Sequence, residues 1–124
     1  MNKNALLKAA CRGDAEIVRH VIPHCDVNRR DKKGGTALMY ASLYGNEASV
    51  DTLLMNGGDV SLTCVDGWTP LMYAASKGHA HICRALLAKG ARADVEDVDG
   101  LSVLMIAVQR GHAGTCKVGG YIHI

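Results

Sequence analysis

Apolar residues recur along this chain in short blocks with helical spacing, and the same polar and glycine signals bound each block. In residues 67–79, GWTPLMYAASKGH, Thr69 can cap a helix with its hydroxyl, and Pro70 suits the first helical position, where a missing N–H costs nothing. The alanines that follow let another helix approach closely, and Gly78 can adopt the left-handed conformation that ends a helix. The pattern predicts a tight turn followed by a short helix of small residues.

A similar block occurs on either side of this one in the sequence. It reads GGTALMYASLYGN over residues 34–46 and GLSVLMIAVQRGH over residues 100–112, and the cap positions Thr36, Thr69 and Ser102 follow one another at intervals of 33 residues. A fixed period of this length is typical of repeat architectures.

A second apolar pattern follows each of the first three blocks and predicts a second helix in each copy. The apolar side chains share one helix face, and they are Ile17, Val18, Val21 and Ile22, then Val50, Leu53 and Leu54, then Ile82, Cys83, Leu86 and Leu87. Asn46 is expected to cap one of these helices, and Gly57 and Gly90 are expected to end two of them. One helix pair cannot bury its apolar face alone, whereas a stack of pairs forms a continuous core.

The period divides the chain into four copies over residues 1–118. They span approximately residues 4–28, 29–61, 62–94 and 95–118, and a non-repeat tail follows at 119–124. In the first copy Asn4 takes the place of the cap threonine. In the last copy the second helix is doubtful, because glycines stand at 119 and 120 where earlier copies have two leucines. The C-terminal end is therefore predicted to be the least protected part of the stack.

Composition narrows the class of protein. Hydrophobic residues make up 48% of the 124 residues, but the chain has one Trp, four Tyr and no Phe, so Ala, Leu and Val must fill the core. No apolar run approaches the ~20 residues that span a bilayer, and the N-terminal apolar patch is too short for a signal peptide. The five cysteines have no CxxC spacing, so we expect reduced thiols and a cytoplasmic, or else nuclear, location.

The phrases KGGTALMYASLYGNEASVDTLLMNGGDVS and DGWTPLMYAASKGHAHICRALLAKGARAD resemble ankyrin repeats, and the resemblance covers roughly residues 4–118. It implies an all-α solenoid of antiparallel helix pairs joined by extended, hairpin-like loops. One departure is systematic, because Met39, Met72 and Met105 stand where the family usually has His. We interpret these methionines as apolar filling in place of a hydrogen bond that ties the loop.

The resemblance implies a non-catalytic protein–protein interaction module of the adaptor or scaffold type. A small free-standing inhibitor of an enzyme or transcription factor is the alternative. The mild net charge of +2 and the short basic run at 29–33 do not lead us to expect nucleic acid as the partner. We expect no cofactor, no metal, no small-molecule substrate and no membrane partner. His79 and His112 follow helix-ending glycines, where histidines of the family hydrogen-bond to neighbouring backbone.

Members of the family usually bind partners on the loop tips and on the exposed side of the first helices. Carried over to this sequence, the partner-binding residues are Arg12, Arg30, Lys32, Lys33, Leu43, Tyr44, Val65, Asp66, Trp68, Lys77, Val98, Asp99, Leu101 and Arg110. We predict Trp68 as the main anchor, since aromatic residues dominate interface hot spots. The first loop is basic and the third is acidic, so charge is expected to orient the partner.

Overall fold

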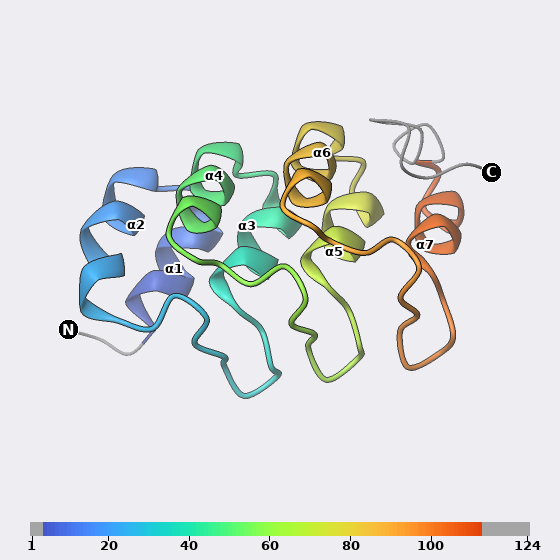
Figure 1. Ribbon diagram of the computed structural model, residues 1–124, viewed down its shortest axis with the longest axis horizontal. Helices are drawn as coiled ribbons and strands as arrows, with labels where there is room; N and C mark the ends of the chain where they lie inside the picture. The colour runs from blue at the N-terminus through green and yellow to red at the C-terminus, as the bar shows by residue number, and fades with distance from the viewer. Residues whose placement is uncertain (1–3, 113–124) are drawn as a thin grey trace.

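The computed structural model describes residues 4–112, which form helix pairs stacked side by side (Figure 1). The pairs are α1 (Ala5–Arg12) with α2 (Ala15–Val21), α3 (Ala37–Tyr44) with α4 (Glu47–Met55), and α5 (Pro70–Ser76) with α6 (Ala80–Ala88). A 3-10 helix, η1 (Ile22–His24), follows α2, and α7 (Val103–Gln109) is the last described helix. The structure thus has the all-α solenoid architecture that the sequence predicts.

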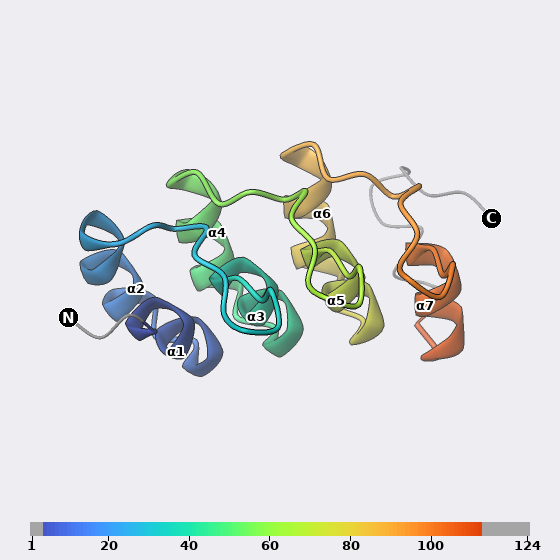
Figure 2. The same ribbon diagram turned by 90° about the horizontal axis from the view of Figure 1, so that it is seen from below.

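The helices form two rows (Figure 2). In one row α1 contacts α3, α3 contacts α5, and α5 contacts α7, and in the other α2 contacts α4 and α4 contacts α6. Each helix also contacts its partner in the other row within the first three pairs. The core lies between the rows and continues from one pair to the next.

Helix starts in the first row follow the predicted caps. The hydroxyls of Thr36, Thr69 and Ser102 each accept a hydrogen bond from the backbone N–H three residues later, at 3.3 Å in every case. Two predicted caps are wrong: the side chains of Asn4 and Asn46 make no capping hydrogen bond at the helices they precede. Asn46 instead donates to the carbonyl of Ala10 at 2.5 Å, which leaves its amide engaged with the preceding repeat.

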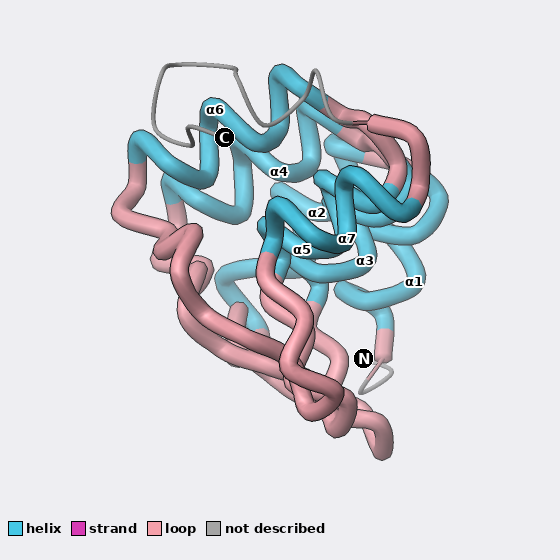
Figure 3. The backbone as a smooth tube through the Cα atoms, turned by 90° about the vertical axis from the view of Figure 1, so that its right-hand side faces the viewer, coloured by secondary structure: helices cyan, strands magenta, loops and turns pink. Residues whose placement is uncertain are grey.

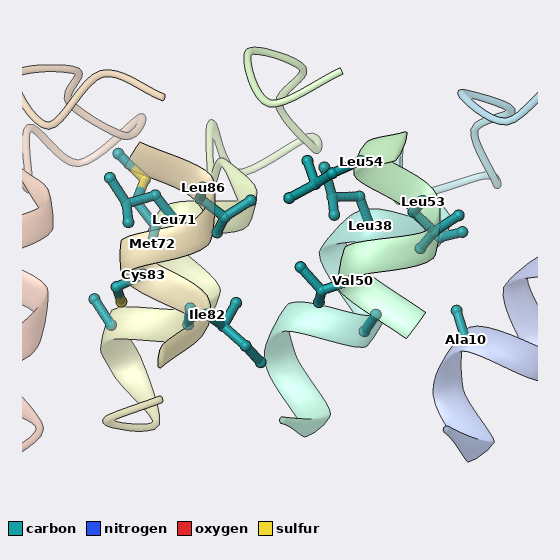
Figure 4. Close-up of a cluster of buried hydrophobic side chains, with 14 of the residues drawn as sticks. Ala10, Leu38, Val50, Leu53, Leu54, Leu71, Met72, Ile82, Cys83 and Leu86 are labelled. Atoms are coloured by element: carbon teal, nitrogen blue, oxygen red, sulfur yellow. The ribbon is translucent and has the colours of Figure 1, made fainter. Parts of the chain in front are cut away.

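The predicted core faces are largely confirmed. Every apolar residue assigned above to α4 and α6 is buried. Figure 4 shows most of these side chains and labels Val50, Leu53, Leu54, Ile82, Cys83 and Leu86. In α2, Val18 and Val21 are buried, but Ile17 is 42% exposed because no described helix pair precedes this one. The α-helix ends at Val21, and the 3-10 helix Ile22–His24 continues it, with Pro23 in its first turn.

The three methionines at the period of 33 differ in their surroundings. Met39 and Met72 are almost fully buried, as expected, because α5 covers α3 and α7 covers α5. Met105 is 50% exposed, which corrects the interpretation of this residue as core filling. No helix within residues 4–112 follows α7, so its outer face has no covering neighbour.

The loops that join the pairs project on the same side of the stack (Figure 3). Their backbones are joined, because the N–H of Val65 donates to the carbonyl of Lys33 at 2.9 Å and that of Val98 donates to the carbonyl of Asp66 at 3.0 Å. Gly67 has a φ of 77°, and a Cβ there would lie 3.0 Å from the backbone nitrogen of Val98. Only glycine combines that left-handed backbone with such a close approach.

Residues 113–124 lie outside the described part of the chain. They include the doubtful last helix, Cys116, the glycines at 119 and 120, and the 119–124 tail, so the prediction that this end is the least protected stays a prediction. No helix among those described is long and apolar enough to cross a membrane.

Candidate functional site

Three equivalent turns form the loop tips, at residues 29–35, 62–68 and 95–101. In each turn a residue at the period of 33 closes the loop through the same pair of backbone hydrogen bonds. These residues are Asp31, Cys64 and Asp97. Their side chains differ, and the difference determines how each loop tip is held.

Asp31 organises the first loop tip. Its carboxylate accepts hydrogen bonds from the backbone N–H groups of Lys33 at 3.0 Å and Gly35 at 2.8 Å, and from the hydroxyl of Tyr40. Burial raises the pKa of Asp31, but the bonds from Tyr40 and the two backbone groups outweigh it, and the pKa is lowered. Burial, and then the bond to Asp31, raises the pKa of Tyr40. The first loop is therefore tied to α3 of its own repeat.

Cys64 stands at the same position of the second loop tip. It is buried, and its Sγ accepts a hydrogen bond from the hydroxyl of Tyr73 at 3.3 Å. Burial, followed by this bond, raises the pKa of Tyr73. A thiol is a weak acceptor compared with a carboxylate, so this loop tip is held less strongly by its own residue.

The third loop tip is held partly by the second. The carboxylate of Asp97 accepts hydrogen bonds from the backbone N–H groups of Asp99 and Leu101, both at 2.9 Å, and from the indole Nε1–H of Trp68 at 2.8 Å. The bond from Leu101 is the main cause of the lowered pKa of Asp97, and the bond from Trp68 adds to it. Trp68 thereby connects two neighbouring loops.

Trp68 is half-buried rather than exposed. Its ring lies 5.0 Å from that of Tyr73, centroid to centroid, and the guanidinium carbon of Arg110 lies 6.0 Å from its centroid. Trp68 and Leu101 also pack against the core, and Leu43 is half-buried. The expectation that these three side chains are exposed is corrected, because the stacked loops and helices cover part of each.

The other predicted residues lie on the surface. The largest exposed apolar side chains among them are Val98 at 67%, Val65 at 65% and Tyr44 at 56%. The charged residues in the predicted set are all exposed, and they are Arg12, Arg30, Lys32, Lys33, Asp66, Lys77, Asp99 and Arg110. Two valines at equivalent positions therefore present apolar side chains at the ends of the second and third loops.

Two hollows on the loop side bring many of these residues together. The central hollow, about 270 Å³, lies between the first and second loops and is lined by Lys33, Gly35, Met39, Tyr40, Leu43, Cys64, Val65, Asp66 and Tyr73. The Trp68 hollow, about 300 Å³, is lined by Leu43, Asp66, Trp68, Tyr73, Ser76, Lys77 and Arg110. The two hollows share Leu43, Asp66 and Tyr73 and so form one depression. Tyr44, Val98, Asp99 and Leu101 line neither hollow.

Sequence reasoning missed the two tyrosines of this depression. Tyr40 and Tyr73 stand at the period of 33 in the first turns of α3 and α5, and their hydroxyls reach back to Asp31 and Cys64. An aromatic residue that recurs at the same position of two repeats was the available signal. Both rings pair a polar hydroxyl with apolar area, which suits a wet binding surface.

Side chains that follow the helix-ending glycines bridge neighbouring repeats. The ring Nε2 of His79 lies 3.2 Å from the carbonyl oxygen of Leu43, which confirms the predicted structural role of this histidine. His112 lies against Gly78, where a Cβ would come within 2.6 Å of its ring nitrogen. No group of three or more His, Cys, Asp or Glu side chains in the described part of the chain is arranged to hold a metal ion.

A family of known proteins matches most of this chain, and a curated relative matches a shorter part of it. The family described as ankyrin repeats (3 copies) matches residues 1–64 and 49–118. Inversin-B of Xenopus laevis is 47% identical to the chain over 51 residues, which are 39% of this chain and 5% of that protein. The chain therefore spans only a small part of that relative. With the stacked helix pairs and the extended loops, these matches show that the chain belongs to the ankyrin-repeat family, whose repeats generally mediate protein–protein interaction.

Proposed function

We propose that this chain is a non-catalytic adaptor or scaffold module that binds a partner protein through its loop tips and the adjoining depression. The observation that carries the proposal is the joining of the central and Trp68 hollows beside exposed Val65. An apolar, partly aromatic depression with a charged rim has the composition of a protein interface. The rim is supplied by Lys33, Asp66, Lys77 and Arg110.

The loop tips are suited to binding because they are ordered in advance. Backbone hydrogen bonds join the three loops, and Asp31 and Asp97 fix two of the turns from within. A surface that is already ordered loses little conformational entropy when a partner binds. Val65 and Val98 project from this rigid base and offer apolar area for burial.

We further propose that the protein acts in the cytoplasm or the nucleus. Cys11, Cys25, Cys64 and Cys83 are free thiols in the described structure, which suits a reducing compartment. Burial, and the nearby carboxylate of Asp31, raise the pKa of Cys11, so this thiol stays protonated and is a poor nucleophile. Both points support a binding role over a catalytic one.

The proposal is tested by quantitative capture from cell lysate with matched variants. Tyr44→Ser combined with Val65→Ser removes two exposed apolar side chains of the predicted partner-binding set, and Val65 also lines the central hollow. Ile17→Ser combined with Met55→Ser removes two exposed apolar side chains outside that set. We expect the first variant to capture at least about tenfold less partner than wild type, and the second to capture as much as wild type, as for hot-spot and non-interface residues. Equal capture by both variants would contradict the proposal.

Capture stoichiometry also separates the adaptor from the alternative function. A free-standing inhibitor yields one partner in a stoichiometric complex, whereas an adaptor or scaffold yields several partners bound less tightly. The Tyr44→Ser, Val65→Ser variant is expected to release all of them.

A further inference from the structure

A second depression lies at the N-terminal end of the loop side and adjoins the central hollow, with which it shares Lys33 and Tyr40. One part, the basic hollow of about 540 Å³, is lined by Arg29, Arg30, Lys32 and Lys33 together with Asn4, Asp31 and Tyr40. The other part, the α1 hollow of about 350 Å³, is lined by Lys8 and Arg12 with Leu7 and Cys11. Both parts include Asn4, Asp31 and Tyr40, so they form one continuous trough along α1 and the first loop.

Six cationic side chains line this basic trough, and one carboxylate does. The carboxylate belongs to Asp31, and it already accepts three hydrogen bonds from Lys33, Gly35 and Tyr40. Each of these donors is a neutral backbone or phenol group, so Asp31 makes no direct ion pair with a cation of the trough, although Lys33 attracts its charge and Arg30 attracts that of Asp59. The trough therefore keeps a concentrated positive charge on a protein whose net charge is only +2.

None of the six cations forms an ion pair within residues 4–112. The described ion pairs are Arg19 with Glu16, His81 with Glu47, and Arg92 with Asp94, and all of them lie outside the trough. The Nε of Arg29 is also buried without an acceptor in the described structure. Buried donors are normally satisfied, so this nitrogen is an exception.

The charge changes sign along the same side of the molecule. The tips of the second and third loops carry exposed Asp66, Glu96 and Asp99, and the buried carboxylate of Asp97 lies beneath them. A long polyanion that followed the row of loops would meet these carboxylates and be repelled. A short acidic segment can lie in the trough without reaching them.

We infer that the basic trough binds an acidic peptide segment of the partner protein, with glutamate or aspartate side chains on the cations and an apolar side chain against Cys11 and Tyr40. Guanidinium groups bind carboxylates through paired hydrogen bonds, and the ammonium groups add point charges. The inference rests on the proposed function, and it adds the chemistry of one part of the partner and the site that receives it.

The test measures binding of a fluorescein-labelled peptide of repeated Glu-Glu-Leu triplets by fluorescence anisotropy. Arg30→Glu combined with Lys32→Glu reverses two cations of the basic hollow, and Lys8→Glu combined with Arg12→Glu reverses two of the α1 hollow. The matched control, Arg84→Glu combined with Lys89→Glu, makes the same change of net charge on exposed positions of α6 and just after it. Thermal melting verifies that each variant is folded.

Each trough variant is expected to raise the Kd at least about tenfold and the control less than about threefold, since close charge pairs act far more strongly than distant screened ones. A peptide with Gln in place of Glu should bind weakly to all proteins. Equal losses in the trough variants and the control would overturn the inference, because net charge alone would then explain binding. Tighter binding of an oligothymidylate than of the acidic peptide, lost in the trough variants, would assign the trough to nucleic acid and also overturn it.

These outcomes are separable from the fate of the proposed function. If the acidic peptide does not bind but lysate partners are lost from the Tyr44→Ser, Val65→Ser variant, only the inference fails. If the peptide binds in the trough while that variant keeps its partners, the proposed role of the central depression fails instead.

Discussion

The first loop tip and the junction between the second and third loop tips are held in place by different hydrogen bonds. In the first, Asp31 binds two backbone N–H groups and the hydroxyl of Tyr40, all within its own repeat. At the junction, Cys64 offers a weak acceptor to Tyr73, and Trp68 reaches across to Asp97 of the next loop. The side chain of Asp31 acts only within its own repeat, whereas a side-chain hydrogen bond from Trp68 to Asp97 joins the second tip to the third.

This difference predicts how far the effect of a substitution extends. A substitution at Asp31 should destabilise mainly the first loop and α3. A substitution at Trp68 should destabilise two loops at once, because its ring packs on Tyr73 and its indole N–H donates a hydrogen bond to Asp97. In a linear array, interactions between neighbouring units are what make unfolding cooperative.

The largest expected effect comes from breaking the shared junction. Trp68→Ala should lower the free energy of unfolding by about 3 kcal/mol, since it removes a half-buried ring that packs on the core. Trp68→Phe should cost about 1 kcal/mol, because it keeps the ring and loses one hydrogen bond. Urea unfolding measures both values, with Tyr44→Ala as the exposed aromatic control. A negligible loss in Trp68→Ala would show that the ring of Trp68 does not stabilise the fold.

Breaking the local tip should have a smaller effect. Asp31→Ala removes the acceptor of two backbone N–H groups and of Tyr40, and should cost about 2 kcal/mol, as for hydrogen bonds to a charged group. Cys64→Ala should cost less than about 1 kcal/mol, because the thiol accepts one weak bond. The control is Asp51→Ala, at an exposed position of α4. Hydrogen exchange should show the loss of protection confined to the first loop and α3 in Asp31→Ala, and a uniform loss would contradict the local assignment.

The stabilising contribution of Asp31 should depend on pH. The pKa of Asp31 is lowered from its ordinary value of 3.8, so the folded state holds the carboxylate more strongly than the unfolded chain does. Its stabilising contribution is therefore present above the unfolded pKa and is lost as the pH falls through the lower, folded pKa. The difference in melting temperature between wild type and Asp31→Asn should be largest near neutral pH and shrink as the pH falls below the ordinary carboxyl pKa of 3.8. A difference that grows on acidification would show that the sign is wrong.

The smallest effect should come from making the second loop tip resemble the first. Cys64→Asp places a carboxylate where the first and third tips already have one, and it would offer an acceptor to Tyr73 and to backbone N–H groups of the turn. We expect a gain of about 0.5 to 1 kcal/mol in the free energy of unfolding at neutral pH. A loss would show that the buried carboxylate is not satisfied there, and Cys64→Ser serves as the uncharged control.

The helices could be predicted from the sequence because their signals are local. Thr69, Pro70 and Gly78 act within one turn of the residues they affect, and the structure confirms both ends of α5. The apolar faces of α4 and α6 follow from spacing alone. The role of Asn46 was predicted wrongly, because an asparagine at this position can either cap its own helix or hydrogen-bond to the preceding repeat. Only the position of α1 in the folded structure shows that the carbonyl of Ala10 is within reach.

The binding surface was harder to predict because exposure at a loop tip depends on the neighbouring loop. Val65 and Trp68 lie three positions apart in one turn, yet Val65 projects outward while Trp68 turns toward Asp97. Nothing in the spacing distinguishes them, since a loop lacks the fixed period of a helix or strand. The basic run at 29–33 was visible in the sequence, but Lys8 and Arg12 join it only through the packing of α1 against the first loop.

The bridges between repeats also bear on how the chain folds as it is synthesised. Asn46 binds the carbonyl of Ala10, and His79 approaches the carbonyl of Leu43, at separations of 36 residues in both cases. Each helix pair therefore finds its neighbour among residues that have already left the ribosome. Growth from the N-terminus can proceed pair by pair, with no unit waiting for a distant part of the chain before it docks.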